Sequence, residues 1–205
     1  MGRHEGLRLR AAKLAAAGAA LKRQSGADAP FCLAFLTDAL RAPHPLLVAR
    51  VLPKGAAVIL RDYGVRRRAG LAAQLKSVCA ARGVKLIIGA DPALAVRIGA
   101  DGVHLPRWYS PGSALPENLI VTASAHDEGE LARAKELGAG LALLSPVFAT
   151  ASHPEGGGLG AARFKALAAA APVPVLALGG ADEASAAMIA GPNVAGLAAI
   201  GAFLD

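Results

Sequence analysis

The chain has 205 residues, of which 54% are hydrophobic and 4% aromatic, so it can bury a large aliphatic core in one large domain or two small ones. Its formal charge is +7, but the basic residues cluster near the start and at Arg66 to Arg68 rather than in one stripe, and no aromatic residues are interleaved with them, which argues against a nucleic-acid partner. Cys32 and Cys79 lack a CxxC spacing and no stretch reaches 18 apolar residues, so we expect a reduced, cytoplasmic protein without a membrane span.

The first segment, residues 1–30, is basic and contains the alanine-rich stretch AAKLAAAGAALKRQ. As a signal peptide this stretch fails, because Lys13 and Lys22 interrupt or flank a centre that is poor in leucine. We expect a helical extension that packs on the following domain, residues 31–205, although packing against a partner subunit is also open.

Eight short apolar runs follow, too short for helices and too continuously apolar for strands with one exposed face. They span residues 31–38, 56–62, 84–91, 101–106, 119–126, 141–146, 173–180 and 195–201. Such runs are typical of parallel strands that helices cover on the outside.

Helical patterns separate most of these runs. They span residues 64–83, 92–100, 127–139, 160–171 and 182–191. Eight strands that alternate with helices predict an α/β protein with a compact (β/α)₈ (TIM) barrel. An open doubly wound sheet is the alternative, but its Gly-x-Gly-x-x-Gly fingerprint is missing after the first run, in FLTDAL.

Ligands of such barrels bind at the carboxyl ends of the strands. The seventh run ends in Gly179 and Gly180, and the eighth in Ile200 and Gly201. Glycines that expose backbone N–H groups before a helix suit a phosphate, and we favour that interpretation over a tight turn alone.

The loop after the sixth run, in LLSPVFATASHPEGGGLG (143–160), combines hydroxyl groups with three consecutive glycines. Thr150 and Ser152 offer donors without charge, and the glycines would let the loop fold over a ligand. The alternative is an insertion without a binding role.

Ser124 and His126 are two residues apart at the end of the fifth run, a spacing that places both on one face of an extended strand. A histidine transfers protons near neutral pH, so His126 is our candidate catalytic residue, with Ser124 beside it. His104, inside GVHLP, is either a core residue or a second histidine at the barrel mouth.

Five stretches together resemble the thiamine-phosphate synthase family, which includes the TenI-type thiazole tautomerases. They are FLTD (35–38), GADGVHLP (99–106), SAH (124–126), SPVFATASH (145–153) and PVPVLALGG (172–180). The resemblance runs in order from about residue 31 to residue 203. It implies a (β/α)₈ barrel and a small-molecule ligand from thiamine biosynthesis.

The resemblance implies binding residues for a thiazole phosphate. The matching positions are Thr150, Ser152, Gly180, Ile200 and Gly201, together with Arg61 and Ser124. Family members commonly have serine at the position of Gly201, so one hydroxyl is missing here while the backbone donor remains.

The other half of the family's site, which binds a diphosphate with Mg²⁺, departs from the pattern. Tyr63 replaces a lysine, Gly89 and Ala90 replace an Asn-Asp pair, Tyr109 lies near the position of an aspartate, and His153 replaces a second lysine. Because Mg²⁺ prefers carboxylate and phosphate oxygens, we expect no metal or other cofactor.

Three hypotheses follow. The first is a thiazole tautomerase-like isomerase in which His126 transfers the proton, as the histidine after strand five does in that branch. The second is a thiamine-phosphate synthase whose Mg²⁺ site is rebuilt from Asp38, Asp62 or Asp91. The third is a sensor of thiazole or thiamine phosphate that binds without turnover. The resemblance also makes a homodimer an expectation, and the role of Trp108 and Tyr109 stays open.

Overall fold

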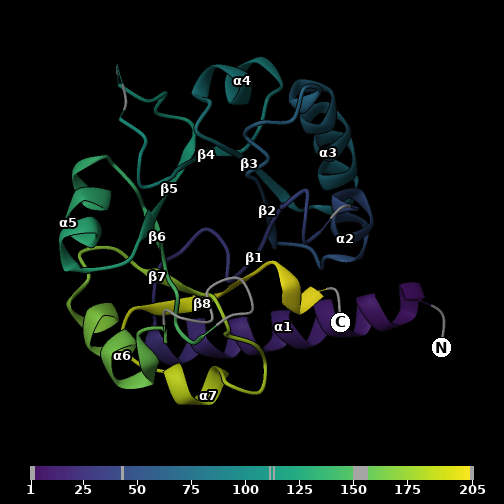
Figure 1. Ribbon diagram of the computed structural model, residues 1–205. Helices are drawn as coiled ribbons and strands as arrows, with labels where there is room; N and C mark the ends of the chain where they lie inside the picture. Colours follow the sequence, from purple (N-terminus) through teal and green to yellow (C-terminus); the bar gives the residue numbers. More distant parts are fainter. Residues whose placement is uncertain (1–2, 43, 111, 113, 150–156, 204–205) are drawn as a thin grey trace.

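A computed structural model describes residues 3–42, 44–110, 112, 114–149 and 157–203. Its eight strands form a closed parallel barrel in chain order, and helices surround the barrel (Figure 1). The strands are β1 (Leu33–Leu36), β2 (Ala57–Leu60), β3 (Lys85–Gly89), β4 (Gly102–Leu105), β5 (Ile120–Ala125), β6 (Leu141–Leu144), β7 (Val175–Leu178) and β8 (Val194–Ala199). The predicted (β/α)₈ fold is therefore confirmed.

The helices differ in places from those that the sequence predicts. They are α1 (Arg3–Ser25), α2 (Pro45–Val51), α3 (Arg68–Arg82), α4 (Pro92–Arg97), α5 (Glu128–Glu136), α6 (Gly160–Ala170) and α7 (Ala186–Ile189), with a 3-10 turn, η2 (Gly201–Phe203). The helical patterns did not predict α2, which has a proline in its first turn. Between β4 and β5 the described residues contain no helix.

Continuous burial of the strands explains why they read as unbroken apolar runs. Most strand residues are fully buried, since the barrel interior covers one face and the helices cover the other. Parallel pairing sets Gly89 opposite His104 and His104 opposite Thr122, so the tips of β3, β4 and β5 lie next to one another. Of the helices described, none is both long enough and apolar enough to span a membrane.

The long helix α1 lies across the barrel beside β8 and β1 (Figure 1). Ala11, Leu14 and Leu21 form its buried stripe, at the three- and four-residue spacing of a helix face. Gly18 belongs to the same stripe and lies so close to the barrel that an added Cβ would stand 2.3 Å from the Cys32 carbonyl oxygen. A glycine here lets the helix approach the strand backbone.

This close approach predicts opposite effects for one substitution at two positions of α1. Gly6→Ala is expected to raise the free energy of unfolding by about 0.5–1 kcal/mol, because alanine favours helix and its Cβ would meet nothing within 4 Å. Gly18→Ala should instead lower it by about 1–3 kcal/mol, because its Cβ collides with backbone. Urea unfolding of both variants measures the difference. Equal stabilisation at the two positions would contradict this packing of α1.

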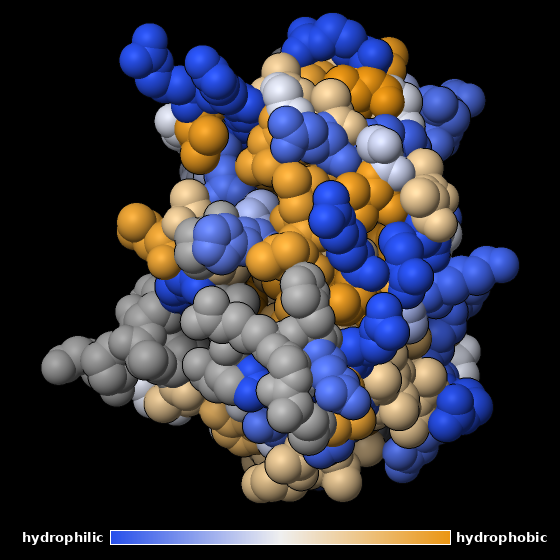
Figure 2. All heavy atoms as spheres, turned by 90° about the vertical axis from the view of Figure 1, so that its right-hand side faces the viewer, coloured by the Kyte–Doolittle hydropathy of each residue, from blue (hydrophilic) through white to orange (hydrophobic). Residues whose placement is uncertain are grey.

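The outer face of the barrel at α2 and α3 is mixed in character. Figure 2 views that face, where hydrophilic side chains surround an apolar area in the middle. The tripeptide Arg66 to Arg68 lies here, with Arg66 and Arg67 exposed and Arg68 turned inward. The homodimer that the resemblance implies stays a prediction.

Candidate functional site

At the carboxyl end of β5, His126 belongs to a chain of charged groups. Its Nδ1 lies 2.7 Å from Glu130 Oε2, and its backbone N–H donates to the same oxygen at 3.0 Å. The other carboxylate oxygen of Glu130 lies 2.6 Å from Arg107 Nε. The side chain of His126 is 39% exposed, whereas Glu130 is largely buried at 15%. His126 is therefore held through one ring nitrogen, and Nε2 makes no hydrogen bond to another described residue.

The sequence contained a signal for Glu130 that the search for strand-end residues missed. Asp127 is the N-cap of α5, and its side chain accepts from the backbone N–H of Glu130 at 2.8 Å. An acid three residues after an N-cap is the pattern of a capping box, in which that acid reaches back to the start of the helix. Here Glu130 reaches back to His126, one residue before the cap.

Ser124 has a different partner from His126. Its hydroxyl lies 2.9 Å from Nε2 of His104, whose Nδ1 lies 3.0 Å from the hydroxyl of Thr122. Thr122 and Ser124 thus share one face of β5, as the period-two argument requires, while His126 follows the strand and turns to α5. Ser124 and His126 therefore contact different residues: Ser124 contacts His104 on β4, and His126 contacts Glu130 on α5.

His104 is a buried residue of the barrel rather than an exposed group at its mouth. Burial lowers its pKa to about 3, and the positive charge of Arg61 acts in the same direction. The ring is therefore neutral at physiological pH, with one nitrogen donating and the other accepting. It fixes the position of the Ser124 hydroxyl without itself carrying a charge.

Arg61 extends from the end of β2 toward the next strands. Its backbone N–H donates to the Thr37 hydroxyl at 3.0 Å. Burial of the phenol raises the pKa of Tyr63, and the positive charge of Arg61 nearby partly opposes that rise. Arg61, a candidate ligand for the substrate, thus lies close enough to both Tyr63 and the buried His104 for its charge to act on them.

Tyr63 and Arg68 occupy the space over the tips of β2 and β3. The Arg68 guanidinium donates to the carbonyls of Leu60 and Gly89 and lies 3.4 Å from an Asp91 carboxylate oxygen. Its carbon is 5.7 Å from the centre of the Tyr63 ring. The two terminal nitrogens of Arg68 are therefore engaged by the barrel itself, whereas its buried Nε has no hydrogen-bond partner among the described residues.

Two of the three carboxylates considered for a rebuilt metal site have partners, and the third, Asp62, is buried at the end of β2. Asp38 accepts from the backbone N–H groups of Leu40 and Arg41 and pairs with the Arg41 side chain at 2.7 Å. Asp91 is the N-cap of α4, where it accepts from the Leu94 N–H at 2.9 Å. Among the described residues there is no group of three or more His, Cys, Asp or Glu side chains that could hold a metal ion.

Trp108 and Tyr109 follow β4 in a turn that α5 holds in place. The Arg133 side chain donates to the carbonyls of Arg107 and Tyr109, and the Tyr109 N–H donates to the Pro106 carbonyl. The Trp108 ring is 5.4 Å from the Tyr63 ring, in an edge-to-face arrangement. Trp108 nevertheless remains 65% exposed.

The glycine pair after β7 makes a tight turn that also packs closely. Gly179 and Gly180 have φ values of 88° and 67°, which favour glycine. A Cβ on Gly180 would stand 2.8 Å from Phe148 Cβ, so the turn fits against the loop after β6. Close packing of the turn explains why these positions are glycine, and the phosphate cradle stays a prediction.

The remaining candidates on this flank are placed in part. Ile200 is 8% exposed, and Gly201 begins η2, where a Cβ would meet nothing within 4 Å. The candidates Thr150 and Ser152 lie outside the described residues.

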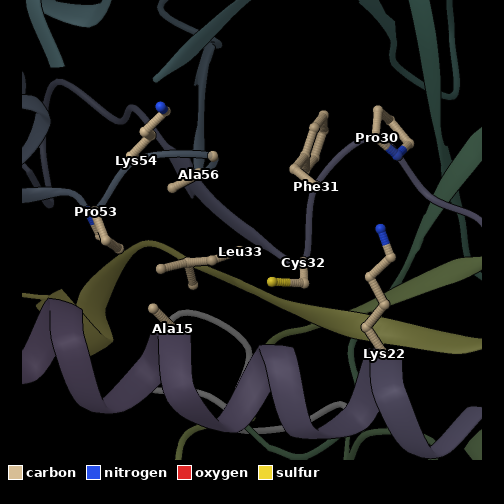
Figure 3. A pocket seen from close by; sticks show the side chains of 10 residues that line it. Ala15, Lys22, Pro30, Phe31, Cys32, Leu33, Pro53, Lys54 and Ala56 are labelled. Carbon is tan, nitrogen blue, oxygen red and sulfur yellow. The ribbon is translucent and has the colours of Figure 1, made fainter. Parts of the chain in front are cut away.

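Two cavities lie away from the candidate catalytic and phosphate-binding residues. One, of about 200 Å³, is at the opposite end of the barrel, between α1 and the segments that precede β1 and β2. Figure 3 shows Lys22, Cys32 and Lys54 among its lining side chains. Burial raises the pKa of the Cys32 thiol, so this cysteine is not activated as a nucleophile. The other, of about 430 Å³, lies between α4 and the loop that contains Tyr109 and Leu115.

Comparisons with known proteins agree on one family. The family model described as thiamine monophosphate synthase matches residues 33–203. The chain is 37% identical over 169 residues to a thiamine-phosphate synthase of Chromobacterium violaceum, covering 78% of this chain and 80% of that protein. It is 34% identical to a thiamine-phosphate synthase of Methanoculleus marisnigri, covering 78% and 79%.

Solved structures show the same fold. A thiamine phosphate pyrophosphorylase from Pyrococcus furiosus aligns with a TM-score of 0.67 and 21% identity, covering 82% of this chain and 84% of that one. At this identity the likeness concerns the barrel alone.

Proposed function

We propose an isomerase activity for this chain, which belongs to the thiamine monophosphate synthase family of thiamine biosynthesis. The chain would act on a thiazole phosphate in the manner of the thiazole tautomerases. Such a reaction moves a proton from one carbon of the substrate to another, so that the thiazole ring becomes aromatic and no atom is gained or lost. The site then needs a proton carrier and a grip on the phosphate, without a metal ion.

The arrangement of His126 carries this proposal. Glu130 accepts from Nδ1 at 2.7 Å and is itself paired with Arg107 at 2.6 Å. Because Nδ1 is engaged by Glu130, Nε2 is the ring nitrogen that can take a proton from the substrate. The carboxylate then stabilises the imidazolium that forms. Ser124, held by the neutral His104, supplies a hydroxyl beside the substrate at the tip of the same strand.

For the phosphate we propose the opposite flank, at the tips of β7 and β8. The backbone N–H groups of Gly180 and Gly201 would donate to its oxygens, with Gly179 and Ile200 shaping the turns. Thr150 and Ser152 would add hydroxyl donors from the loop after β6, and Arg61 would contribute positive charge from across the mouth. With its phosphate in this cradle, the substrate would extend its ring across the mouth toward His126.

Synthase activity is the second candidate function, and the names of the relatives favour it, since those proteins are called thiamine-phosphate synthases. Against it, Tyr63 and Arg68 fill the flank where the resemblance implies a diphosphate, and Asp38 and Asp91 already bind other groups. Asp62 is left as a single buried acid at the end of β2, and the described residues hold no cluster of ligands for the metal that would stabilise departure of a diphosphate.

Two assays on the purified chain separate the candidates. In the first, the unaromatised thiazole carboxylate phosphate is added and its ultraviolet spectrum is followed. We expect conversion to the aromatic ring, at a rate proportional to protein concentration. In the second, a pyrimidine diphosphate, a thiazole phosphate and Mg²⁺ are supplied, and release of pyrophosphate is measured. We expect none.

Each assay also has a contrary outcome. Pyrophosphate release with no conversion in the first assay would reject the isomerase in favour of the synthase. Binding of the thiazole phosphate with no turnover in either assay would reject both in favour of a sensor.

A further inference from the structure

Tyr63 stands where neighbouring backbone leaves no room for a side chain on β3. A Cβ on Gly89 would lie 2.9 Å from Tyr63 Cε1, 3.2 Å from its hydroxyl oxygen and 2.8 Å from the Leu60 carbonyl oxygen. The ring therefore covers the tip of β3 directly, and Gly89 is required for it to do so. The Tyr63 ring and any larger side chain at position 89 exclude one another.

The neighbours of Tyr63 hold its ring on two sides. The Arg68 guanidinium, anchored on the carbonyls of Leu60 and Gly89, lies 5.7 Å from the ring centre. The Trp108 ring meets it edge to face at 5.4 Å. Both contacts are favourable geometries for aromatic rings, so the orientation of Tyr63 is fixed before any ligand arrives.

Trp108 combines a fixed position with wide exposure. Its turn is tied to α5 through Arg133, and its neighbour Arg107 pairs with the Glu130 that holds His126. A side chain that is 65% exposed on such a well-held turn offers a large apolar surface at the barrel mouth, next to the proton carrier.

We propose that Tyr63 and Trp108 form an aromatic wall that binds the planar ring of the small-molecule ligand and closes this flank to a diphosphate. The inference rests on the proposed function and explains how the site would select its ligand, a heteroaromatic ring that carries a single phosphate. A ring lying against the wall has its phosphate directed toward β7 and β8 and one edge near His126. A magnesium diphosphate would meet aromatic faces and the Arg68 guanidinium, whose two terminal nitrogens already contact carbonyl and carboxylate oxygens.

Trp108 itself reports on this wall, because it is the chain's single tryptophan. The intact protein is titrated with an aromatic thiazole phosphate, with inorganic phosphate and with magnesium pyrophosphate, while tryptophan fluorescence is followed. We expect a saturable change with the thiazole phosphate. We expect no change with inorganic phosphate, although it should compete for the cradle. Magnesium pyrophosphate should cause no saturable change.

Two variants of Tyr63 test the wall independently of fluorescence. Tyr63→Leu should weaken binding of the thiazole phosphate about five- to tenfold in calorimetry, since it removes the aromatic face. Tyr63→Phe, the matched control, keeps that face and should bind within about twofold of the unmodified chain. Circular dichroism verifies that both variants fold.

The outcomes distinguish this wall from the proposed function. Binding that changes Trp108 fluorescence without ring conversion would overturn the isomerase and support the wall. Conversion with unchanged fluorescence and an unchanged dissociation constant in Tyr63→Leu would overturn the wall and leave the isomerase. A saturable response to magnesium pyrophosphate in the unmodified chain would also overturn the wall.

Discussion

Replacing His126 with alanine is expected to lower the rate of ring conversion by about 10²–10⁴-fold, the usual contribution of a positioned general acid–base group. Affinity for the aromatic thiazole phosphate should change little, because we propose that the phosphate binds at the tips of β7 and β8, on the other flank of the barrel mouth. Stopped-flow absorbance gives the rate and calorimetry gives the affinity. Equal rates in His126→Ala and the unmodified chain would exclude His126 as the proton carrier.

Glu130 provides a graded version of the same test. Glu130→Gln retains the size of the side chain but removes the charge that faces Nδ1 of His126. Loss of one charge-assisted hydrogen bond predicts a rate about ten- to a hundredfold lower, smaller than the effect of His126→Ala. Glu128→Gln is the matched control, because Glu128 is an exposed acid in the same first turn of α5. If Glu128→Gln lost as much activity, the loss would come from a general effect on α5 rather than from the contact between Glu130 and His126.

The barrel could be predicted because its strands carry their own signal. A strand buried on both faces must be continuously apolar, and the runs at 84–91 and 141–146 contain β3 and β6 for that reason. The ends of helices were less predictable. The pattern over 64–83 begins four residues before α3, and Arg66 and Arg67 lie exposed in the preceding turn. Helix ends depend on local capping, and here no side chain caps the start of α3.

The candidate site was predictable only where a single strand end determined it. His126 and the glycine pair could be named as candidates because each stands at the end of an apolar run. The contact between His104 and Ser124 joins residues on different strands, so it depends on the register between β4 and β5, which no local pattern reveals. The same holds for the contact between Tyr63 and Gly89. Each departs from the family's pattern, and the structure shows that the Tyr63 ring fills the space that a side chain at position 89 would need.

Acid is expected to destabilise the fold through His104. The folded pKa of this ring is about 3, against an ordinary value of 6.5, so between these values the unfolded chain binds a proton that the folded chain does not. Stability contributed by the neutral ring is therefore fully present above pH 6.5 and is lost as the pH falls toward 3. For this one group, linkage gives a loss of about 2 kcal/mol in the free energy of unfolding between pH 7.5 and pH 5.

His104→Gln removes the titrating group while keeping polar atoms that can bond to Thr122 and Ser124. The variant should be less stable at neutral pH, but its free energy of unfolding should fall by about 2 kcal/mol less than that of the unmodified chain between pH 7.5 and pH 5. Urea unfolding at both pH values measures this difference. His44→Gln, at an exposed histidine, should keep the full pH dependence. Because burial is the main cause of the low pKa, the same full dependence in His104→Gln would mean that the ring is hydrated in the folded chain and that Ser124 is not held by a neutral imidazole.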